Sequence, residues 1–222
     1  MTAKVITITN QKGGAGKSTL TMQLAGSFSK KYKVMVIDAD PQATATRWAS
    51  SSPDEYPFNA TICGLGAAGG KVHREVKKYL SDYDYIFIDT PPAVDSPVPQ
   101  SALMVSDLAL IPIIPSPPDL WAGIAIKELI SRMQDFNEHL EARLVINMCQ
   151  SNTNIAKDII SIVDDFEIDK SETSLVLRTA YRQSAAFGCT VHDLKKVADI
   201  TIDKKACDEI DRLCDEIRFI LK

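Results

Sequence analysis

A glycine-rich run closed by a lysine and two hydroxyl residues occupies residues 10–19, which read Asn-Gln-Lys-Gly-Gly-Ala-Gly-Lys-Ser-Thr. An apolar run, Val5–Thr9, precedes it and a helix-like run, Lys17–Lys30, follows. In such a strand–loop–helix unit, backbone N–H groups and the helix N-terminus bind phosphates. Lys17 would reach the terminal phosphates and the Ser18 hydroxyl would ligate Mg²⁺. The spacing favours a nucleoside triphosphate site over a plain glycine-rich turn.

Polar side chains follow three other apolar runs. Asp38 and Asp40 end one run, in Asp-Ala-Asp-Pro-Gln, where two carboxylates could position the waters of a magnesium ion and an attacking water. Asp89 ends the run Ile86–Ile88, as in a Walker B strand whose acid holds the metal. Asn147 follows Val145-Ile146 and could read an adenine edge. Ordinary strand-terminal turns are the alternative for all three clusters.

Apolar, β-branched runs alternate with amphipathic segments along the chain. This pattern predicts an α/β fold with a doubly wound, mostly parallel sheet and helices on both faces. The predicted strands are Val5–Thr9, Val34–Asp38, Tyr85–Asp89, Leu108–Ile114, Leu144–Met148 and Leu175–Leu177. The predicted helices are Lys17–Lys30, Val72–Leu80, Leu120–Glu138, Ile155–Phe166 and Ala206–Leu221. We expect the polar stretch Trp48–Pro57 and the small-residue loop Gly64–Gly70 to be surface excursions.

The length of 222 residues suits one well-buried domain, residues 1–222. No apolar run reaches the roughly 20 residues of a membrane span, and because the predicted first strand starts at residue 5 we expect no signal peptide. Five cysteines and three histidines are dispersed, so we expect no structural zinc site. Free cysteines favour a cytoplasmic location.

At these motifs the chain resembles the ParA/MinD family of deviant Walker A ATPases. The matching stretches are Lys-Gly-Gly-Ala-Gly-Lys-Ser, Asp-Ala-Asp-Pro-Gln, Ile-Asp-Thr-Pro-Pro and the later Leu-Arg-Thr-Ala-Tyr-Arg, residues 177–182. The likeness is greatest to short ParA-type proteins that lack an N-terminal helix-turn-helix.

The resemblance implies a role for each matching residue. Lys12 would cross a dimer interface to the partner's nucleotide, and Asp40 would orient the attacking water. Asp89, with Ser18 and Asp40, would support Mg²⁺, and Asn147 would contact adenine. The phosphates of ATP would be held by Gly13, Gly14, Ala15, Gly16, Lys17, Ser18 and Thr19. ATP would thus assemble a homodimer, and slow hydrolysis, stimulated by a ParB-like or adaptor protein, would dissolve it.

The segment from Arg178 to Lys205 favours DNA as the surface that such a dimer binds. It carries six basic and three acidic residues in a chain whose net charge is −4. Such a patch gives sequence-independent attraction to phosphates, and hence association with the nucleoid. The candidate DNA contacts are Arg178, Arg182, Lys195 and Lys196.

A membrane-associated ATPase similar to MinD and a P-loop enzyme of the synthetase type are the alternatives. The C-terminal amphipathic helix has many acids on its polar face, which an anionic bilayer would repel. We therefore expect that helix to pack on the sheet and expect no membrane binding. A synthetase would have no need of Lys12 in trans. Plasmid partition, chromosome segregation and the positioning of a protein assembly remain equally open as roles.

Overall fold

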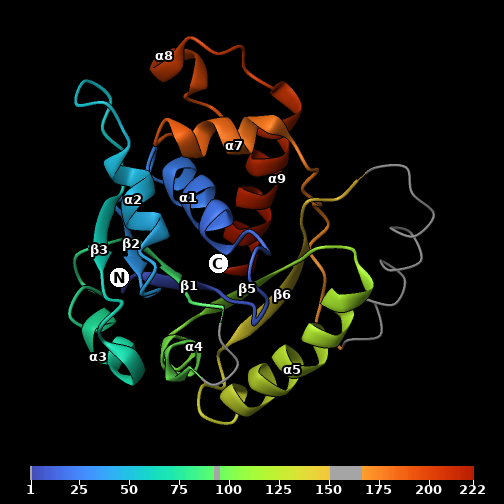
Figure 1. The fold of residues 1–222 in the computed structure, drawn as a ribbon. Helices are drawn as coiled ribbons and strands as arrows, with labels where there is room; N and C mark the ends of the chain where they lie inside the picture. Colours follow the sequence, from blue (N-terminus) through green and yellow to red (C-terminus); the bar gives the residue numbers. More distant parts are fainter. Residues whose placement is uncertain (1, 93–95, 151–166) are drawn as a thin grey trace.

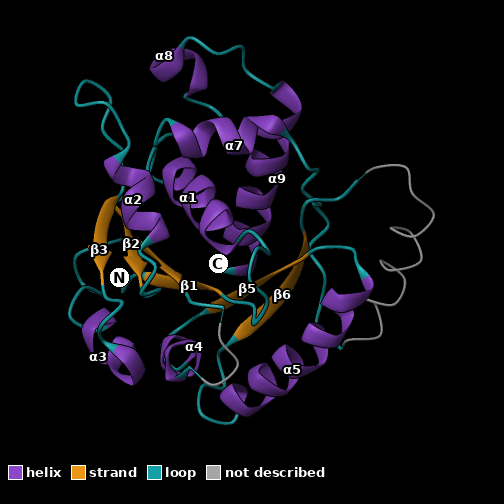
Figure 2. Ribbon diagram, viewed as in Figure 1, coloured by secondary structure: helices purple, strands orange, loops and turns teal. Residues whose placement is uncertain are grey.

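A six-stranded parallel sheet forms the middle of the molecule (Figures 1 and 2). The computed structural model describes residues 2–92, 96–150 and 167–222, with the backbone alone for residues 117–124. The strand order is β3-β2-β4-β1-β5-β6, and each neighbouring pair is parallel. The strands are β1 (Lys4–Ile8), β2 (Val34–Asp38), β3 (Thr61–Gly64), β4 (Tyr85–Asp89), β5 (Leu108–Ile113) and β6 (Glu141–Ile146). The predicted α/β fold class is confirmed.

Helices cover both faces of this sheet. Figure 1 shows α1, α2, α7 and α9 on one face and α3, α4 and α5 on the other. Their bounds are α1 (Lys17–Phe28), α2 (Thr44–Ser50), α3 (Val72–Val76), α4 (Pro97–Leu103), α5 (Pro117–Gln134), α7 (Thr179–Ala186), α8 (Leu194–Ala198) and α9 (Lys204–Ile220), with a 3-10 turn at Gly69–Lys71. No helix within the described ranges has both the length and the apolar character needed to cross a bilayer.

The largest apolar core lies between the sheet, α1 and α9. Ile6, Ile8 and Phe87 point into it from the strands, because alternate side chains of a strand face opposite sides. Helix α9 contributes a stripe of fully buried side chains that includes Ile210 and Leu213. The C-terminal helix therefore packs on the sheet, as its spacing predicts.

Several short elements differ from the sequence-based expectations. Strand β3 and helices α2, α4, α7 and α8 were not predicted, because they are too short to show a clear apolar period. Trp48 belongs to α2 and is 5% exposed, so the expected surface excursion is wrong at its start. Residues 175–177 form an isolated bridge through Val176 to Cys149 instead of a strand.

Three other helices differ from their predicted bounds. Helix α3 stops at Val76, helix α5 begins at Pro117, and α1 ends at Phe28. Helix α5 begins at Pro117 because proline is well tolerated in the first turn of a helix. The helix expected at Ile155–Phe166 lies outside the described residues.

The sheet register brings the predicted site residues to one edge. Asp89 pairs with Ile8 on β1 and with Asp38 on β2. These three residues are the last of their strands, so the loop after Ile8 and both acids meet at the carboxyl edge. Ligands of open α/β sheets bind at this edge.

Candidate active site

The loop after β1 is anchored at its start by Asn10, a buried residue to which the sequence analysis gave no role. Its Nδ2 donates to the Pro112 carbonyl at 2.7 Å, and its Oδ1 accepts from the Lys12 N–H at 3.0 Å. One amide side chain thus joins the loop to strand β5. This bond fixes where the chain leaves the sheet.

Glycines shape the turn of the loop. Gly14 and Gly16 have φ angles of 78° and 87°, in the left-handed region that favours glycine. A Cβ added to Gly13 or Gly14 would meet nothing within 4 Å, so the outer side of the loop is open. This space and the N-terminus of α1 suit a polyphosphate.

Lys17 lies inside the loop and is 6% exposed. Its Nζ donates to the Lys12 carbonyl at 3.1 Å, so the side chain is held over the loop. Burial lowers the pKa of Lys17, while Asp89 and Asp40 act in the opposite direction. The ammonium group therefore lies within electrostatic range of both acids.

Asp89 is a fully buried acid. Neither of its carboxylate oxygens accepts a hydrogen bond of good geometry from the described part of the chain, although the Ser18 hydroxyl lies near enough to lower the pKa. Burial dominates and raises the pKa of Asp89 to about 7. A buried carboxylate is unfavourable unless hydrogen bonds or cations compensate it, and the charge of Lys17 compensates Asp89 only in part. Asp89 and Ser18 therefore fit a bound Mg²⁺.

This metal site needs ligands from outside the protein. Within the described residues, no group of three or more His, Cys, Asp or Glu side chains could hold a metal ion. Mg²⁺ usually takes one or two protein ligands and completes its shell with water and substrate phosphates. The sparse donor set fits a metal that arrives with a nucleotide.

Asp38 and Asp40 differ in how they are engaged. Asp38 Oδ2 accepts both the backbone N–H and the hydroxyl of Thr46, each at 2.8 Å, and so holds the first turn of α2. Asp40 Oδ1 accepts the N–H of Gln42 at 2.8 Å, within its own loop. Because Asp38 is committed to the fold, Asp40 is the acid of this pair that is suited to act on a water.

The description "CobQ/CobB/MinD/ParA nucleotide binding domain" belongs to the family model that matches residues 6–200. The chain belongs to this family. Its resemblance to ParA and MinD proteins is thereby confirmed, and the loop, Lys17 and Asp89 remain the predicted nucleotide site.

Relatives within the family span the whole chain. The maintenance of carboxysome distribution protein A of Halothiobacillus neapolitanus is 26% identical over 215 residues, 97% of this chain and 96% of its own. The ATP complex of a Cyanothece McdA variant has a TM-score of 0.76 and 18% identity, covering 95% of this chain and 96% of its own. Cobyrinic acid a,c-diamide synthase of Mycobacterium smegmatis, with ADP and magnesium, has a TM-score of 0.70 and 17% identity, covering 90% and 98%. These two structures share the fold of this chain, and their bound ligands are ATP in the first and ADP with magnesium in the second.

Asn147 braces the nucleotide loop of this family member. Its Nδ2 donates to the Ala15 carbonyl at 2.8 Å, and its Oδ1 accepts the Met148 N–H at 2.9 Å. A Cβ on Gly16 would come within 2.4 Å of the same Nδ2. The structure thus shows contact of Asn147 with the loop, and an adenine contact stays a prediction.

A largely apolar pocket of about 290 Å³ opens beside this loop. Thr19 and Asn147 line the end next to the loop, and Tyr181 and Ile210 line the part between α7 and α9. Leu175 and Leu177 add apolar surface from the extended segment before α7. Because Thr19 and Asn147 place the pocket next to the loop, it is our candidate place for the base of a nucleotide whose phosphates would lie on the loop.

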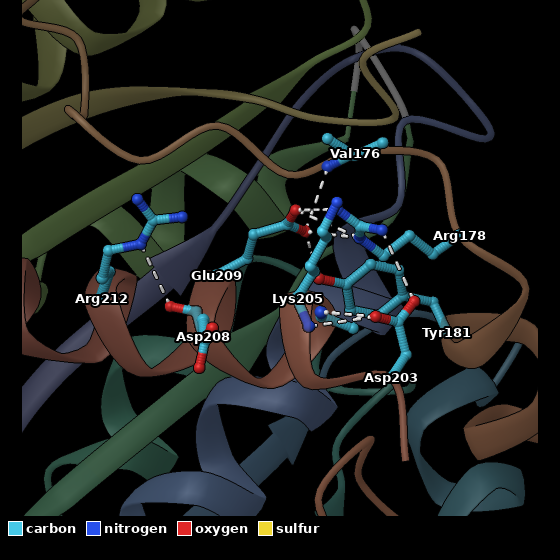
Figure 3. A network of polar contacts seen from close by, with 9 residues as sticks. Val176, Arg178, Tyr181, Asp203, Lys205, Asp208, Glu209 and Arg212 are labelled. Carbon is cyan, nitrogen blue, oxygen red and sulfur yellow. Dashed lines mark hydrogen bonds and ion pairs between the residues drawn. The ribbon is translucent and has the colours of Figure 1, made fainter. Parts of the chain in front are cut away.

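The four predicted DNA contacts have different surroundings. Arg178 points inward, pairs with Glu209 at 2.6 Å and Asp203 at 3.5 Å, and lines the pocket (Figure 3). Arg182 is exposed on α7 at the pocket rim. Lys195 pairs with Asp199 on the surface, and Lys196 Nζ lies 4.7 Å from the Tyr56 ring centre. Arg178 is therefore half-buried with its charge paired, and the other three are at the surface.

Proposed function

We propose that this family member is an ATPase that forms a sandwich dimer with ATP and binds DNA without sequence preference. A partner protein on a cargo would stimulate hydrolysis and release the DNA, and repeated cycles would position the cargo. The observation that carries the proposal is the buried Asp89 carboxylate, which accepts no hydrogen bond of good geometry from the described residues and whose pKa is influenced by Lys17 and Ser18, with Asp40 at the same sheet edge.

The chain's own residues divide the chemistry. Backbone N–H groups of the loop and the Lys17 ammonium group bind and orient the phosphates. Ser18 and Asp89 would hold Mg²⁺, which neutralises phosphate charge when bound. Asp40 orients the attacking water, and Lys12, as the family resemblance implies, contacts the partner subunit's nucleotide. The site is complete only in the dimer.

DNA binding rests on the exposed basic residues around α7 and α8. Arg182, Lys195 and Lys196 lie in the segment that carries the net positive charge. Two copies in a dimer would double the number of phosphate contacts, which strengthens binding and its salt dependence. Arg178 is left out because its guanidinium is bound by Glu209 and Asp203.

A protein assembly is the cargo to test first. The carboxysome distribution protein matches this chain over almost the full length of both, and its name describes the distribution of a protein assembly. Membrane binding is not favoured, because α9 turns its apolar stripe, including Leu213 and Ile217, into the core.

Light scattering, DNA shift assays and ATPase measurements with ATP, ADP or no nucleotide test the proposal. We expect a dimer and DNA binding with ATP alone, and an Asp40→Ala variant that retains the ATP dimer on DNA without turnover. Nucleotide-independent binding to liposomes, or normal hydrolysis by Asp40→Ala, would contradict it.

A further inference from the structure

We infer that Glu209 is a positioning residue that shapes the pocket proposed for the nucleotide base, and thereby sets the affinity for the nucleoside part of the nucleotide. The inference rests on the proposed nucleotide binding. It starts from an acid on the buried side of α9, which is 4% exposed and lies in the row of core residues.

Three different donors meet the Glu209 carboxylate (Figure 3). The Arg178 guanidinium donates through Nε at 3.1 Å and Nη2 at 2.6 Å. The Tyr181 hydroxyl donates at 3.1 Å, and the Val176 N–H at 3.3 Å. Charge-assisted, two-pronged pairs of this kind are among the strongest polar contacts in proteins and restrict geometry.

Every one of these donors belongs to the pocket wall. Val176, Arg178 and Tyr181 all line the pocket, and Ile210, next to Glu209 on α9, lines it from the helix side. The carboxylate therefore lies directly behind the surface that a base would touch. The hydrogen bonds of Glu209 therefore fix the position of the extended segment before α7, and of the first turn of α7, relative to α9.

The other partner of Arg178 cannot take over this role. Asp203 is 3.5 Å from Arg178 Nη1, and its side chain is 34% exposed. The Asp203 carboxylate also caps α9 by accepting from the N–H groups of Lys205 and Ala206. Without the Glu209 charge, the guanidinium would be drawn toward Asp203 and the solvent, and the pocket wall would move with it.

Glu216 provides a matched control on the same helix. It lies two turns beyond Glu209 and fastens the start of the same extended segment, by accepting from the Glu172 N–H at 3.0 Å and from the Thr173 hydroxyl. Neither Glu172 nor Thr173 lines the pocket. Glu216→Gln thus weakens a similar set of hydrogen bonds between α9 and the extended segment, but at residues that do not line the pocket.

The test compares ADP with pyrophosphate, both with Mg²⁺, because the two differ in the nucleoside and ADP avoids hydrolysis. For Glu209→Gln we expect a dissociation constant for ADP raised about tenfold or more, with that for pyrophosphate within about twofold of wild type. Glu216→Gln should leave both unchanged. Equal loss for both probes, or unchanged ADP binding, would overturn the inference.

Two further outcomes are separable. If Glu209→Gln does not fold, Glu209→Asp is tested instead. This variant keeps the negative charge but moves the carboxylate away from Arg178 by about the length of one methylene group. An unchanged ADP affinity in that variant overturns the inference, and a selective loss of ADP affinity supports it. If the wild-type protein binds neither probe, the proposed nucleotide site itself is wrong.

Discussion

Gly66 lies directly against the peptide that joins Asp40 to Pro41. A Cβ on Gly66 would stand 3.1 Å from the Asp40 carbonyl oxygen and 3.0 Å from Pro41 Cα. These distances are shorter than carbon side chains normally tolerate, so a larger residue would displace the Asp40 loop by a few tenths of an ångström. The loop after β3 therefore fixes the position of the acid assigned to the attacking water.

Gly66→Ala should consequently lower the turnover number while sparing nucleotide binding. We expect a loss of about tenfold in kcat, since small displacements of a catalytic group cost that much, and an unchanged affinity for ATP. Gly64→Ala is the control, because its Cβ would meet only Thr46 Oγ1 at an ordinary 3.7 Å. Steady-state ATPase assays check this. Equal activity of the two variants would refute the positioning role.

Lys12→Ala should retain nucleotide binding through Lys17 and lose hydrolysis. A cation supplied by a second subunit to the transition state contributes about 10³-fold or more, so we expect a loss of at least about 100-fold in kcat. A mixture of Lys12→Ala and Asp40→Ala subunits should regain activity, because a heterodimer contains one site with Asp40 and a partner's Lys12. A mixture as inactive as its components would show that Lys12 acts within its own subunit.

Asn147→Ala should weaken the binding of ADP and pyrophosphate alike. The variant removes the donor to the Ala15 carbonyl and the acceptor of the Met148 N–H, and it loosens the loop that both ligands share. Leaving buried polar groups unpaired also costs about 1–3 kcal/mol of stability. Calorimetric titration and thermal unfolding measure these effects. Loss of ADP affinity alone would instead support the predicted adenine contact.

The pH dependence of stability should report the buried acid Asp89. Its pKa is raised by burial to about 7, so between its ordinary pKa and pH 7 the folded protein binds more protons at this group than the unfolded chain. The contribution of Asp89 to stability therefore falls as the pH rises through this range and stays low above it.

Thermal unfolding without Mg²⁺, from about pH 5.5 to about pH 8, tests this dependence. We expect the wild-type protein to lose stability with rising pH more steeply than Asp89→Asn, which carries no titrating group there. Mg²⁺ with ADP should restore the wild-type stability at the upper end. Parallel curves for the two proteins would count against a titrating, only partly compensated Asp89.

Long apolar runs and the loop motif were sufficient to predict five strands of the sheet, β1, β2, β4, β5 and β6, together with α1 and the acids at the sheet edge. Their signals are local, because each depends on residues close together in sequence. The different roles of Asp38 and Asp40 could not be predicted in this way. Asp38 accepts hydrogen bonds from Thr46, eight residues further along the chain, and no sequence motif indicates this contact.

Arg178 and Glu209 show a second reason why sequence alone falls short. The sequence analysis assigned Arg178 to DNA because its charge was visible, whereas its partner Glu209 is 31 residues away on helix α9. One signal was present in the sequence: Glu209 lies at a core position of an amphipathic helix, between Ala206 and Leu213. An acid on an apolar stripe indicates a buried partner.

The bond from Lys17 Nζ to the Lys12 carbonyl has a thermodynamic consequence for the ligand. A flexible lysine side chain loses about 1.5–2 kcal/mol of rotamer freedom when it is fixed, and here that loss takes place during folding. When a phosphate binds, the Lys17 ammonium group exchanges a neutral acceptor, the Lys12 carbonyl, for a charged phosphate oxygen. The lysine side chain is already ordered, so it loses little further rotamer freedom. Association should accordingly be driven by enthalpy and show only a small entropic penalty from this lysine.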